Sequence, residues 1–186
     1  MNPREVWSSS SAHTSGRVHS GFFLNLPAAD KMTAPQYRGI PASEIPVEEL
    51  TQGVRIKVIA GATDLGTSGP IETTTVAPQF FDVSLDPQAR FSQAVPSTHS
   101  GFLYVIEGSL RVGSSADELP KGALGVLGPG DQVAVAAGDE ATRFLLVAGR
   151  PLREPVARYG PFVMNTRQEI MEAIRALQDG SFLGAE

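Results

Sequence analysis

The stretch from residue 98 to residue 112 constrains the fold of this 186-residue chain more than any other. Residues 101–106 form a continuous run of apolar, aromatic and β-branched side chains, which breaks at Glu107 and Gly108 and resumes over 109–112. An apolar run that resumes directly after a glycine turn is typical of two buried strands. The pattern therefore predicts a β-hairpin within an all-β core.

Other short segments of the same character are separated by glycine, proline and aspartate turns. Further strands are expected at 18–27, 54–59, 71–75, 79–85, 123–127, 132–136 and 142–148. Many short strands with turns between them favour a β-sandwich or a barrel.

The last part of the chain carries the pattern of an α-helix. Residues 166–169 have the Thr-x-x-Glu order of a capping box, and Ile170, Ile174 and Leu177 fall on one helical face. Gly180 is placed to end the helix. We expect this helix to pack one apolar face.

Composition divides the chain into three parts, and its length suits one domain with tails. Residues 1–16 contain a run of serines and few apolar residues, so a flexible tail is expected. Residues 17–52 combine a short strand with a proline-rich connector, in which only a brief helical turn near Ser43 is expected. Residues 53–186 carry the remaining strands and the helix of the main domain.

Charge and composition exclude several classes of partner. The formal net charge is -5 and the 15 basic residues are scattered, so direct binding to a nucleic acid is not expected. The chain has no cysteine, which rules out disulfides and thiolate sites and is compatible with a reducing compartment. No apolar segment has the length of a membrane span or the character of a secretory signal. A cytoplasmic protein is expected, with the nucleus as the alternative in a eukaryote.

The stretch 98–112 resembles the first signature of the cupin barrel, Gly-x5-His-x-His-x3-4-Glu-x6-Gly, whose histidines and glutamate bind a metal ion. Counting back from Gly108 places Gly101 where the signature has glutamate. The two histidine positions fall on Pro96 or Ser97 and on Ala94 or Val95. Of these residues only Ser97 has a side chain that binds metal, and it is a weak ligand.

The second cupin signature, Gly-x5-Pro-x-Gly-x2-His-x3-Asn, aligns with Gly122, Gly128 and Gly130. Its histidine and asparagine positions are then Val133 and Ala137, so the ligands are lost while the turn glycines remain. The resemblance implies a cupin-type double-stranded β-helix, or jelly-roll barrel, with a C-terminal α-helix and an extended N-terminal arm. No catalytic, cofactor-binding or metal-binding residue is assigned to this chain.

The alternation of side chains along the strands predicts a barrel filled with apolar groups. The residues expected to point inward are Leu103, Val105, Val133 and Val135, joined by Phe81, Val83 and Leu85. A filled interior argues against a barrel that binds a small molecule.

Other polar residues give no catalytic arrangement. His99 lies at a strand start, where a lone histidine is more often a surface or hydrogen-bonded residue than a metal ligand. The sequence has no Gly-x-Ser-x-Gly elbow for a serine nucleophile. Asp82 with Asp86, and Asp139 with Glu140, are interpreted as solvated carboxylates at turns or strand edges.

Two further features are interpreted as structural. The loop 61–66 is glycine-rich, but no helix follows it, so it lacks the helix N-terminus that cradles phosphate and is interpreted as a plain connection. Arg150, Arg153 and Arg158 form a loose basic group. This group is interpreted as a solvated or interdomain face, with an acidic partner as the alternative.

Several blocks of the sequence resemble the C-terminal part of pirin, a family with two cupin domains. The matching blocks are 25–32, 58–61, 104–108, 146–156 and 159–166. The resemblance extends over about residues 17–182. It implies that the chain corresponds to the C-terminal cupin, with most of the metal-binding N-terminal cupin missing.

In this family the N-terminal cupin holds iron through three histidines and a glutamate, and the C-terminal cupin holds no metal. Some members are quercetin 2,3-dioxygenases, and nuclear eukaryotic members are iron- and redox-responsive transcription cofactors. The family's metal-binding pattern Gly-x-x-His-Ser-Glu matches this chain at His19 and Ser20, but Gly21 replaces the glutamate. The same segment also resembles a His-Gly with which the family strand before Asn-Leu-Pro begins. One imidazole does not hold iron tightly, so no cofactor is expected in this chain.

The leading functional hypothesis is a metal-free interaction module. It would bind a protein partner, a metal-bearing cupin half or a second copy through the N-terminal arm and residues 150–166. This hypothesis predicts an exposed apolar surface around Phe22, Phe23, Phe162 and Met164.

The alternative is an iron-dependent dioxygenase of the quercetin 2,3-dioxygenase type. Its metal site would be completed by another chain, with His19 as one ligand. Stoichiometric iron in the purified chain would favour this alternative.

Overall fold

The computed structural model describes residues 24–34, 37–71, 75–113 and 117–182. These residues divide into two compact units. Residues 34–153 form the first, which we call the β unit, and residues 24–33 with 154–182 form the second, which we call the helical unit. The predicted tail 1–16 and residues 17–23 lie outside the described residues.

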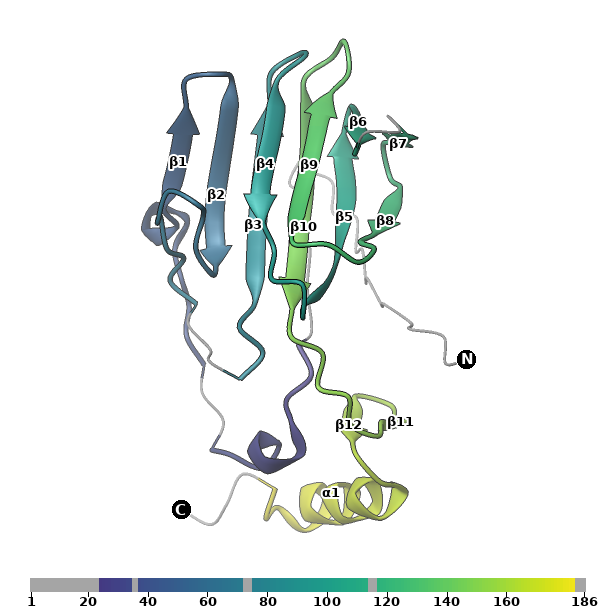
Figure 1. Cartoon of the computed structure of the whole chain (residues 1–186). Coiled ribbons are helices and arrows are strands. Elements are labelled where there is room, and N and C mark those ends of the chain that lie inside the picture. The colour runs from purple at the N-terminus through teal and green to yellow at the C-terminus, as the bar shows by residue number, and fades with distance from the viewer. Residues whose placement is uncertain (1–23, 35–36, 72–74, 114–116, 183–186) are drawn as a thin grey trace. The chain divides into compact units, whose positions relative to one another are not determined.

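Short strands dominate both the chain and its larger unit (Figure 1). The strands of the β unit are β1 (Val47–Leu50), β2 (Val54–Ala60), β3 (Gln79–Leu85), β4 (Arg90–Ala94), β5 (Ser100–Glu107), β6 (Ser109–Val112), β7 (Asp117–Pro120), β8 (Leu124–Val126), β9 (Gln132–Ala137) and β10 (Thr142–Gly149). The helical unit contains β11 (Ala157–Tyr159), β12 (Phe162–Met164) and α1 (Arg167–Asp179). Single 3-10 turns are η1 (Ala28–Asp30) and η2 (Ala42–Glu44). The predicted class, all-β with a C-terminal helix, is confirmed.

Six strands of the β unit form an antiparallel sheet in the order β1-β2-β3-β10-β5-β8. The predicted alternation sets its two faces. On β2, for example, Val54 and Ile56 are 3% and 2% exposed, whereas Arg55 between them is exposed. β10, the last strand of the β unit in chain order, lies in the middle of this sheet between β3 and β5.

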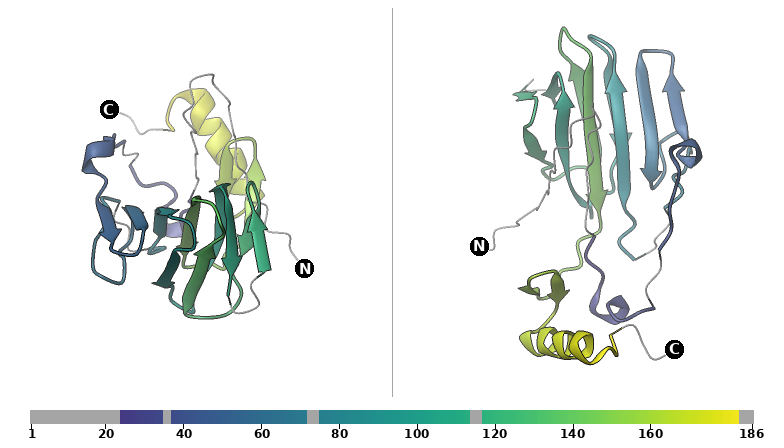
Figure 2. Two further views of the ribbon diagram at one scale, coloured as in Figure 1. Left: turned by 90° about the horizontal axis from the view of Figure 1, so that it is seen from above. Right: turned by 180° about the vertical axis from the view of Figure 1, so that it is seen from behind.

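The strands β4-β9-β6-β7 form a second sheet, which shares the hydrophobic core with the first (Figure 2). The Phe91 ring on β4 meets the Phe144 ring on β10 edge-on, with the ring centroids 5.7 Å apart. The residues predicted to point inward, Leu103, Val105, Val133, Val135, Phe81, Val83 and Leu85, are at most 5% exposed. The predicted apolar filling is confirmed at these positions.

The hairpin predicted at 98–112 is wrong in its pairing. β5 and β6 occupy the expected ranges, but β5 pairs with β10 and β8 in the six-stranded sheet, whereas β6 pairs with β7 and β9 in the other. Between them Gly108 has a φ of +72°, and a Cβ there would lie 2.5 Å from Oγ1 of Thr142 and 2.6 Å from the carbonyl oxygen of Ala141. Only glycine fits this corner, at which the chain passes from one sheet to the other. In sequence, such a corner has the same pattern as a hairpin turn.

The proline-rich connector contains more regular structure than its sequence predicts. The helical turn expected near Ser43 is present as η2, but β1 also forms within the connector, antiparallel to β2. Residues 24–27, expected to end a strand, have no regular secondary structure, and Pro27, which cannot donate to a ladder, directly precedes η1. Of the strand expected at 71–75, Ile71 forms an isolated bridge with Ala60, and residues 72–74 lie outside the described part.

The C-terminal helix forms where it is predicted, but the predicted apolar face is buried only in part: Ile170 is 5% exposed and Ile174 is half-buried, whereas Leu177 is 58% exposed. The Thr166 hydroxyl accepts a hydrogen bond from the N–H of Glu169 at 3.2 Å, and the Glu169 carboxylate accepts one from the N–H of Thr166 at 2.9 Å. Gly180, with a φ of 79°, ends α1, which buries Ile170 and Ala173. In the part of the chain that the structure describes, no helix is long and apolar enough to cross a membrane.

Candidate functional site

The residues at the metal-ligand positions of the cupin signatures divide into two groups: Ala94, Pro96 and Ser97 are exposed, whereas the others lie in the walls of the β unit. Val133 and Ala137 on β9 are 5% and 0% exposed, and Val95 after β4 is 6% exposed. Gly101 on β5 pairs with Ala148 on β10, and a Cβ at Gly101 would lie 2.8 Å from the Cβ of Ala148. These positions contribute packing and a close approach of two strands.

The described residues do not fit an iron centre. Iron requires several imidazole or carboxylate donors that converge on one point. Among the described residues, no three histidine, cysteine, aspartate or glutamate side chains are grouped so that they could hold a metal ion. His19, which matches the family's metal-binding pair, lies outside the described residues. We therefore assign no reaction step to iron in this chain.

His99 precedes β5 and is half-buried. Its Nδ1 atom is buried and has no hydrogen-bond partner in the described part of the chain, so the expectation of a hydrogen-bonded histidine is not met at this atom. Desolvation, assisted by the charge of Arg150, lowers the pKa of His99 and favours the neutral ring. Within the predicted basic group, Arg150 and Arg153 belong to the β unit and Arg158 to the helical unit.

Lys31 joins the two segments that make up the helical unit. Its ammonium group donates to Oδ1 of Asn25 at 2.6 Å and to the carbonyl oxygen of Val163 at 2.9 Å. Desolvation lowers the pKa of Lys31, and the charges of Glu154 and Glu169 act in the opposite direction. Lys31 thereby connects positions 132 residues apart in the chain.

Glu154 makes a second connection between the same segments. Its Oε2 atom accepts a hydrogen bond from the N–H of Ala28 at 2.8 Å and another from Nδ2 of Asn165 at 2.8 Å. Two blocks that carry the family resemblance, 25–32 and the end of 146–156, therefore meet within one unit. We call Asn25, Lys31, Glu154 and Asn165 the polar junction.

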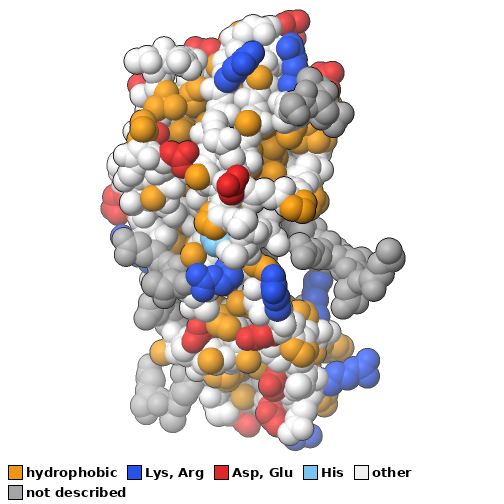
Figure 3. Space-filling model, in the orientation of Figure 1, with side chains coloured by type: hydrophobic (Ala, Val, Ile, Leu, Met, Phe, Trp, Pro, Cys, Tyr) orange, Lys and Arg blue, Asp and Glu red, His pale blue; other side chains and the backbone are white. Residues whose placement is uncertain are grey.

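The helical unit also exposes large apolar side chains (Figure 3). They are Leu24 at 52%, Leu26 at 42%, Met32 at 62%, Val156 at 65%, Tyr159 at 67%, Met171 at 51% and Leu177 at 58%. Half of the exposed large hydrophobic side chains in the described residues thus lie in a unit that supplies about a quarter of those residues. Phe162 and Met164 are half-buried, with Phe162 packed edge-on against Phe182. Phe22 and Phe23 lie outside the described residues.

The glycine-rich loop 61–66 is more than a plain connection. Both carboxylate oxygens of Asp64 accept the N–H of Ala94 at 3.1 Å, and Oδ1 also accepts Nε2 of Gln93 at 2.8 Å. Ala94 ends β4, which is an edge strand of the four-stranded sheet. The loop therefore occupies part of a strand edge that would otherwise be open to pairing.

Asp82 is buried, which corrects its interpretation as a solvated carboxylate. It is 8% exposed and accepts two hydrogen bonds from Arg143, from Nε to Oδ1 at 2.9 Å and from Nη2 to Oδ2 at 2.7 Å. This bidentate contact neutralises the carboxylate and raises the pKa of Arg143. Asp86, Asp139 and Glu140 are exposed, as expected.

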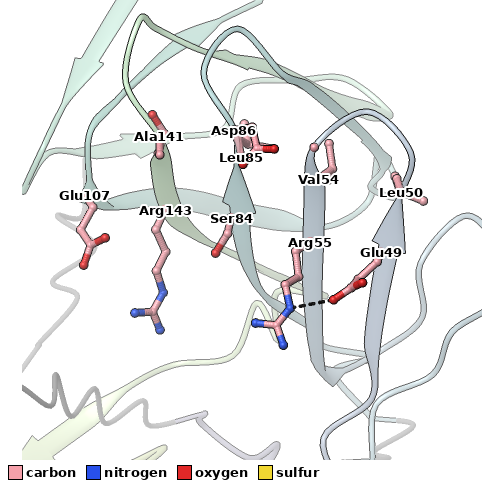
Figure 4. Close-up of a pocket in the computed structure, with 12 residues that line it drawn as sticks. Glu49, Leu50, Val54, Arg55, Ser84, Leu85, Asp86, Glu107, Ala141 and Arg143 are labelled. Atoms are coloured by element: carbon pink, nitrogen blue, oxygen red, sulfur yellow. Dashed lines mark hydrogen bonds and ion pairs between the residues drawn. The ribbon is translucent and has the colours of Figure 1, made fainter.

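Arg143 belongs to a row of polar side chains that crosses five strands. Glu49 on β1 pairs in register with Arg55 on β2, Arg55 with Ser84 on β3, Ser84 with Arg143 on β10, and Arg143 with Glu107 on β5. Residues in register on neighbouring strands share a face of the sheet. We call these five residues the charged row; they line a groove of about 420 Å³ (Figure 4).

Sequence reasoning did not identify the charged row or the connections within the polar junction. Alternation along 54–59 and 142–148 is enough to predict that Arg55 and Arg143 lie on the face opposite the core. The contact between Arg143 and Asp82 joins residues 61 positions apart, which a single sequence does not reveal.

Comparison with known proteins gives a consistent set of matches. Residues 80–183 match the family described as the pirin C-terminal cupin domain. A pirin-like protein from Caulobacter vibrioides is 44% identical over 160 residues, which are 86% of this chain and 57% of that protein. Human pirin is 39% identical over 155 residues, which are 82% of this chain and 52% of that protein.

Proteins named for an activity also match. A putative quercetin 2,3-dioxygenase from Pseudomonas aeruginosa is 37% identical over 162 residues, covering 85% of this chain and 56% of that protein. The crystal structure of a quercetin 2,3-dioxygenase from Acinetobacter baumannii superimposes with a TM-score of 0.77 at 36% identity, over 86% of this chain and 55% of that one. The chain spans a little more than half the length of the curated relatives it matches.

Proposed function

Because the chain belongs to the pirin family of cupin proteins, we propose that it acts as a metal-free interaction module whose partner is a metal-bearing cupin half. The helical unit is the proposed binding surface. This binding surface includes residues 24–33 of the arm and residues 154–166, and both segments contribute to the polar junction.

The observation that carries this proposal is the exposure of apolar side chains on the helical unit. Met32, Val156 and Tyr159 are 62%, 65% and 67% exposed. Large apolar groups that gather on the surface of a soluble protein are a common mark of a protein interface. Aromatic and methionine side chains are enriched in such interfaces, and charged side chains are depleted at their centres.

The polar junction supports the proposal by making this surface rigid before binding. Two hydrogen bonds hold residues 24–33 against residues 154–166, from the Ala28 N–H to Glu154 and from Lys31 to the carbonyl oxygen of Val163. Lys31 also donates to Asn25 and Glu154 also accepts from Asn165, each within its own segment. A surface that is already ordered loses less conformational entropy when it binds a partner. Val133 and Ala137, which stand where the second cupin signature has its histidine and asparagine, support a role without catalysis.

Size-exclusion chromatography with light scattering, combined with binding of an apolar fluorescent dye, tests the proposal. We expect the full chain to self-associate or to bind the dye, and the double variant Val156→Ser/Tyr159→Ser to lose much of either signal. Leu124→Ser/Val126→Ser is the matched control, because these side chains are 42% and 72% exposed in the β unit. A monomer that binds no dye would count against an apolar interface, and so would equal losses in both double variants.

A second candidate function is suggested by the names of relatives. Because some relatives are named as putative quercetin 2,3-dioxygenases, the alternative is an oxygenase whose metal site is shared between two chains. Metal analysis after dialysis and oxygen uptake with quercetin separate the two functions. Stoichiometric iron that is lost in His19→Ala would favour the oxygenase over the interaction module.

A further inference from the structure

We propose that the charged row binds a small oxyanion, a phosphate or carboxylate group, between Arg55 and Arg143 and over Ser84. This groove belongs to the β unit and to the face of the six-stranded sheet that is opposite the core. The proposal therefore does not depend on the interaction function proposed for the helical unit.

Three neighbouring side chains with hydrogen-bond donors, Arg55, Ser84 and Arg143, line the middle of the groove. Nε of Arg55 is engaged by Glu49 at 3.2 Å, and Nε and Nη2 of Arg143 are engaged by Asp82. Within the described part of the chain, no hydrogen bond uses Nη1 of Arg143, either Nη atom of Arg55 or the Ser84 hydroxyl. Figure 4 shows the two arginine side chains extending to the same side of the sheet on either side of Ser84.

The spacing of the strands suits an oxyanion at this point. Arg55 and Arg143 both pair in register with Ser84, so β2 and β10 flank β3. Their backbones are therefore about two strand spacings, roughly 9.5 Å, apart. Two guanidinium groups that lean toward one another across this distance can each donate to one oxyanion, and the short Ser84 side chain leaves room beneath it.

The neighbouring carboxylates hold the arginines in place. Glu49 and Asp82 each bind one guanidinium group, and Asp82 does so from a buried position. Fixing the arginine side chains in advance reduces the entropy that a ligand must remove. The arginines keep considerable access to solvent, with 50% of the Arg55 side chain and 35% of the Arg143 side chain exposed.

Charge at the ends of the row limits the size of the ligand. Glu49 lies beyond Arg55, Glu107 lies beyond Arg143, and Asp86 lines the same groove. A long polyanion such as a nucleic acid would meet these carboxylates on both sides and be repelled. We place a single phosphate or carboxylate group at Ser84, the middle position of the row, which is two strands away from both Glu49 and Glu107.

Titration of the full chain followed by two-dimensional nitrogen–proton NMR tests the proposal. Inorganic phosphate is used in one arm and acetate in the other, at an ionic strength held constant with sodium chloride. We expect saturable shifts of the Arg55, Ser84 and Arg143 resonances. Saturation with phosphate alone identifies a phosphate group as the ligand, and saturation with acetate alone identifies a carboxylate. Shifts that do not saturate with either anion, or that chloride reproduces, would overturn the proposal.

Three variants connect the shifts to the charged row. Arg55→Gln should weaken binding about tenfold, the usual effect of losing one charge-assisted hydrogen bond. Arg143→Lys keeps a positive charge beside Asp82 but loses the guanidinium fork, so it should weaken binding while the fold is kept. Arg111→Gln is the matched control, since Arg111 is 45% exposed and also has an acidic neighbour, Asp139. Unchanged binding in Arg55→Gln would refute the assignment to this row.

Discussion

Asp82 carries its charge at a position of the sheet that is only 8% exposed, and Arg143 is its ion-pair partner. Asp82→Asn leaves the guanidinium group of Arg143 without its charged partner, and we expect it to lower the free energy of unfolding by about 2 kcal/mol. Glu49→Gln removes an ion pair whose side chains are 50% and 72% exposed, so a change below about 0.5 kcal/mol is expected. Urea unfolding of both variants measures the difference, and equal effects would contradict this account.

His99 makes stability depend on pH because its pKa is lower in the folded chain than in the unfolded one. Below about pH 6.5, the ordinary histidine pKa, the unfolded chain binds more protons at this residue than the folded chain does. The free energy of unfolding therefore falls as the pH drops from about 6.5 toward the lower pKa of His99 in the folded chain. Above that window the effect vanishes. His99→Asn should reduce the loss of stability between about pH 7.5 and about pH 5.5, measured by urea unfolding. A loss of the same size in the variant and the parent chain would contradict the burial of Nδ1.

At the scale of elements, the local sequence pattern predicts where strands lie better than it predicts which strands pair with one another. Alternation gave the bounds of β3 and nearly those of β2 and β10, because one face of each strand is buried. β1 was missed because its sequence, Val-Glu-Glu-Leu, is short, polar and placed directly after Pro46 in a connector rich in proline. The charged row escaped prediction for a different reason, since it depends on register across five strands.

Gly108 marks the corner between the two sheets of the β unit. Gly108→Ala places a Cβ at positive φ and within 2.6 Å of the carbonyl oxygen of Ala141, so we expect a loss of at least about 2 kcal/mol in unfolding free energy. Gly113→Ala is the matched control, since Gly113 also has a positive φ, +64°, but has open space around its Cβ position. The control should lose about 1 kcal/mol. Thermal and urea unfolding measure both values, and a smaller loss at Gly108 than at Gly113 would contradict the close approach.

At the scale of the whole molecule, a mutation in the polar junction should speed amide exchange in the helical unit and leave it unchanged in the β unit. Glu154→Ala removes the acceptor of the Ala28 N–H and of Asn165 Nδ2, so amide exchange in residues 24–33 should become about tenfold faster. Exchange in β3 and β10 should stay the same, because these strands belong to the β unit. Glu118→Ala, at an exposed position on β7, is the control. Hydrogen–deuterium exchange followed by mass spectrometry gives the result, and a uniform increase would contradict two separate units.

The place of β10 has a consequence for how the chain is synthesised. A ribosome releases β3 and β5 before it releases residues 142–149, which pair with both of them. Until then, each of these strands offers an open edge to other nascent chains. Productive folding of the β unit must wait for its last strand, which completes the six-stranded sheet at its middle by joining β3 to β5. We expect this protein to depend on chaperones when translation is slow, and to fold slowly after dilution from denaturant.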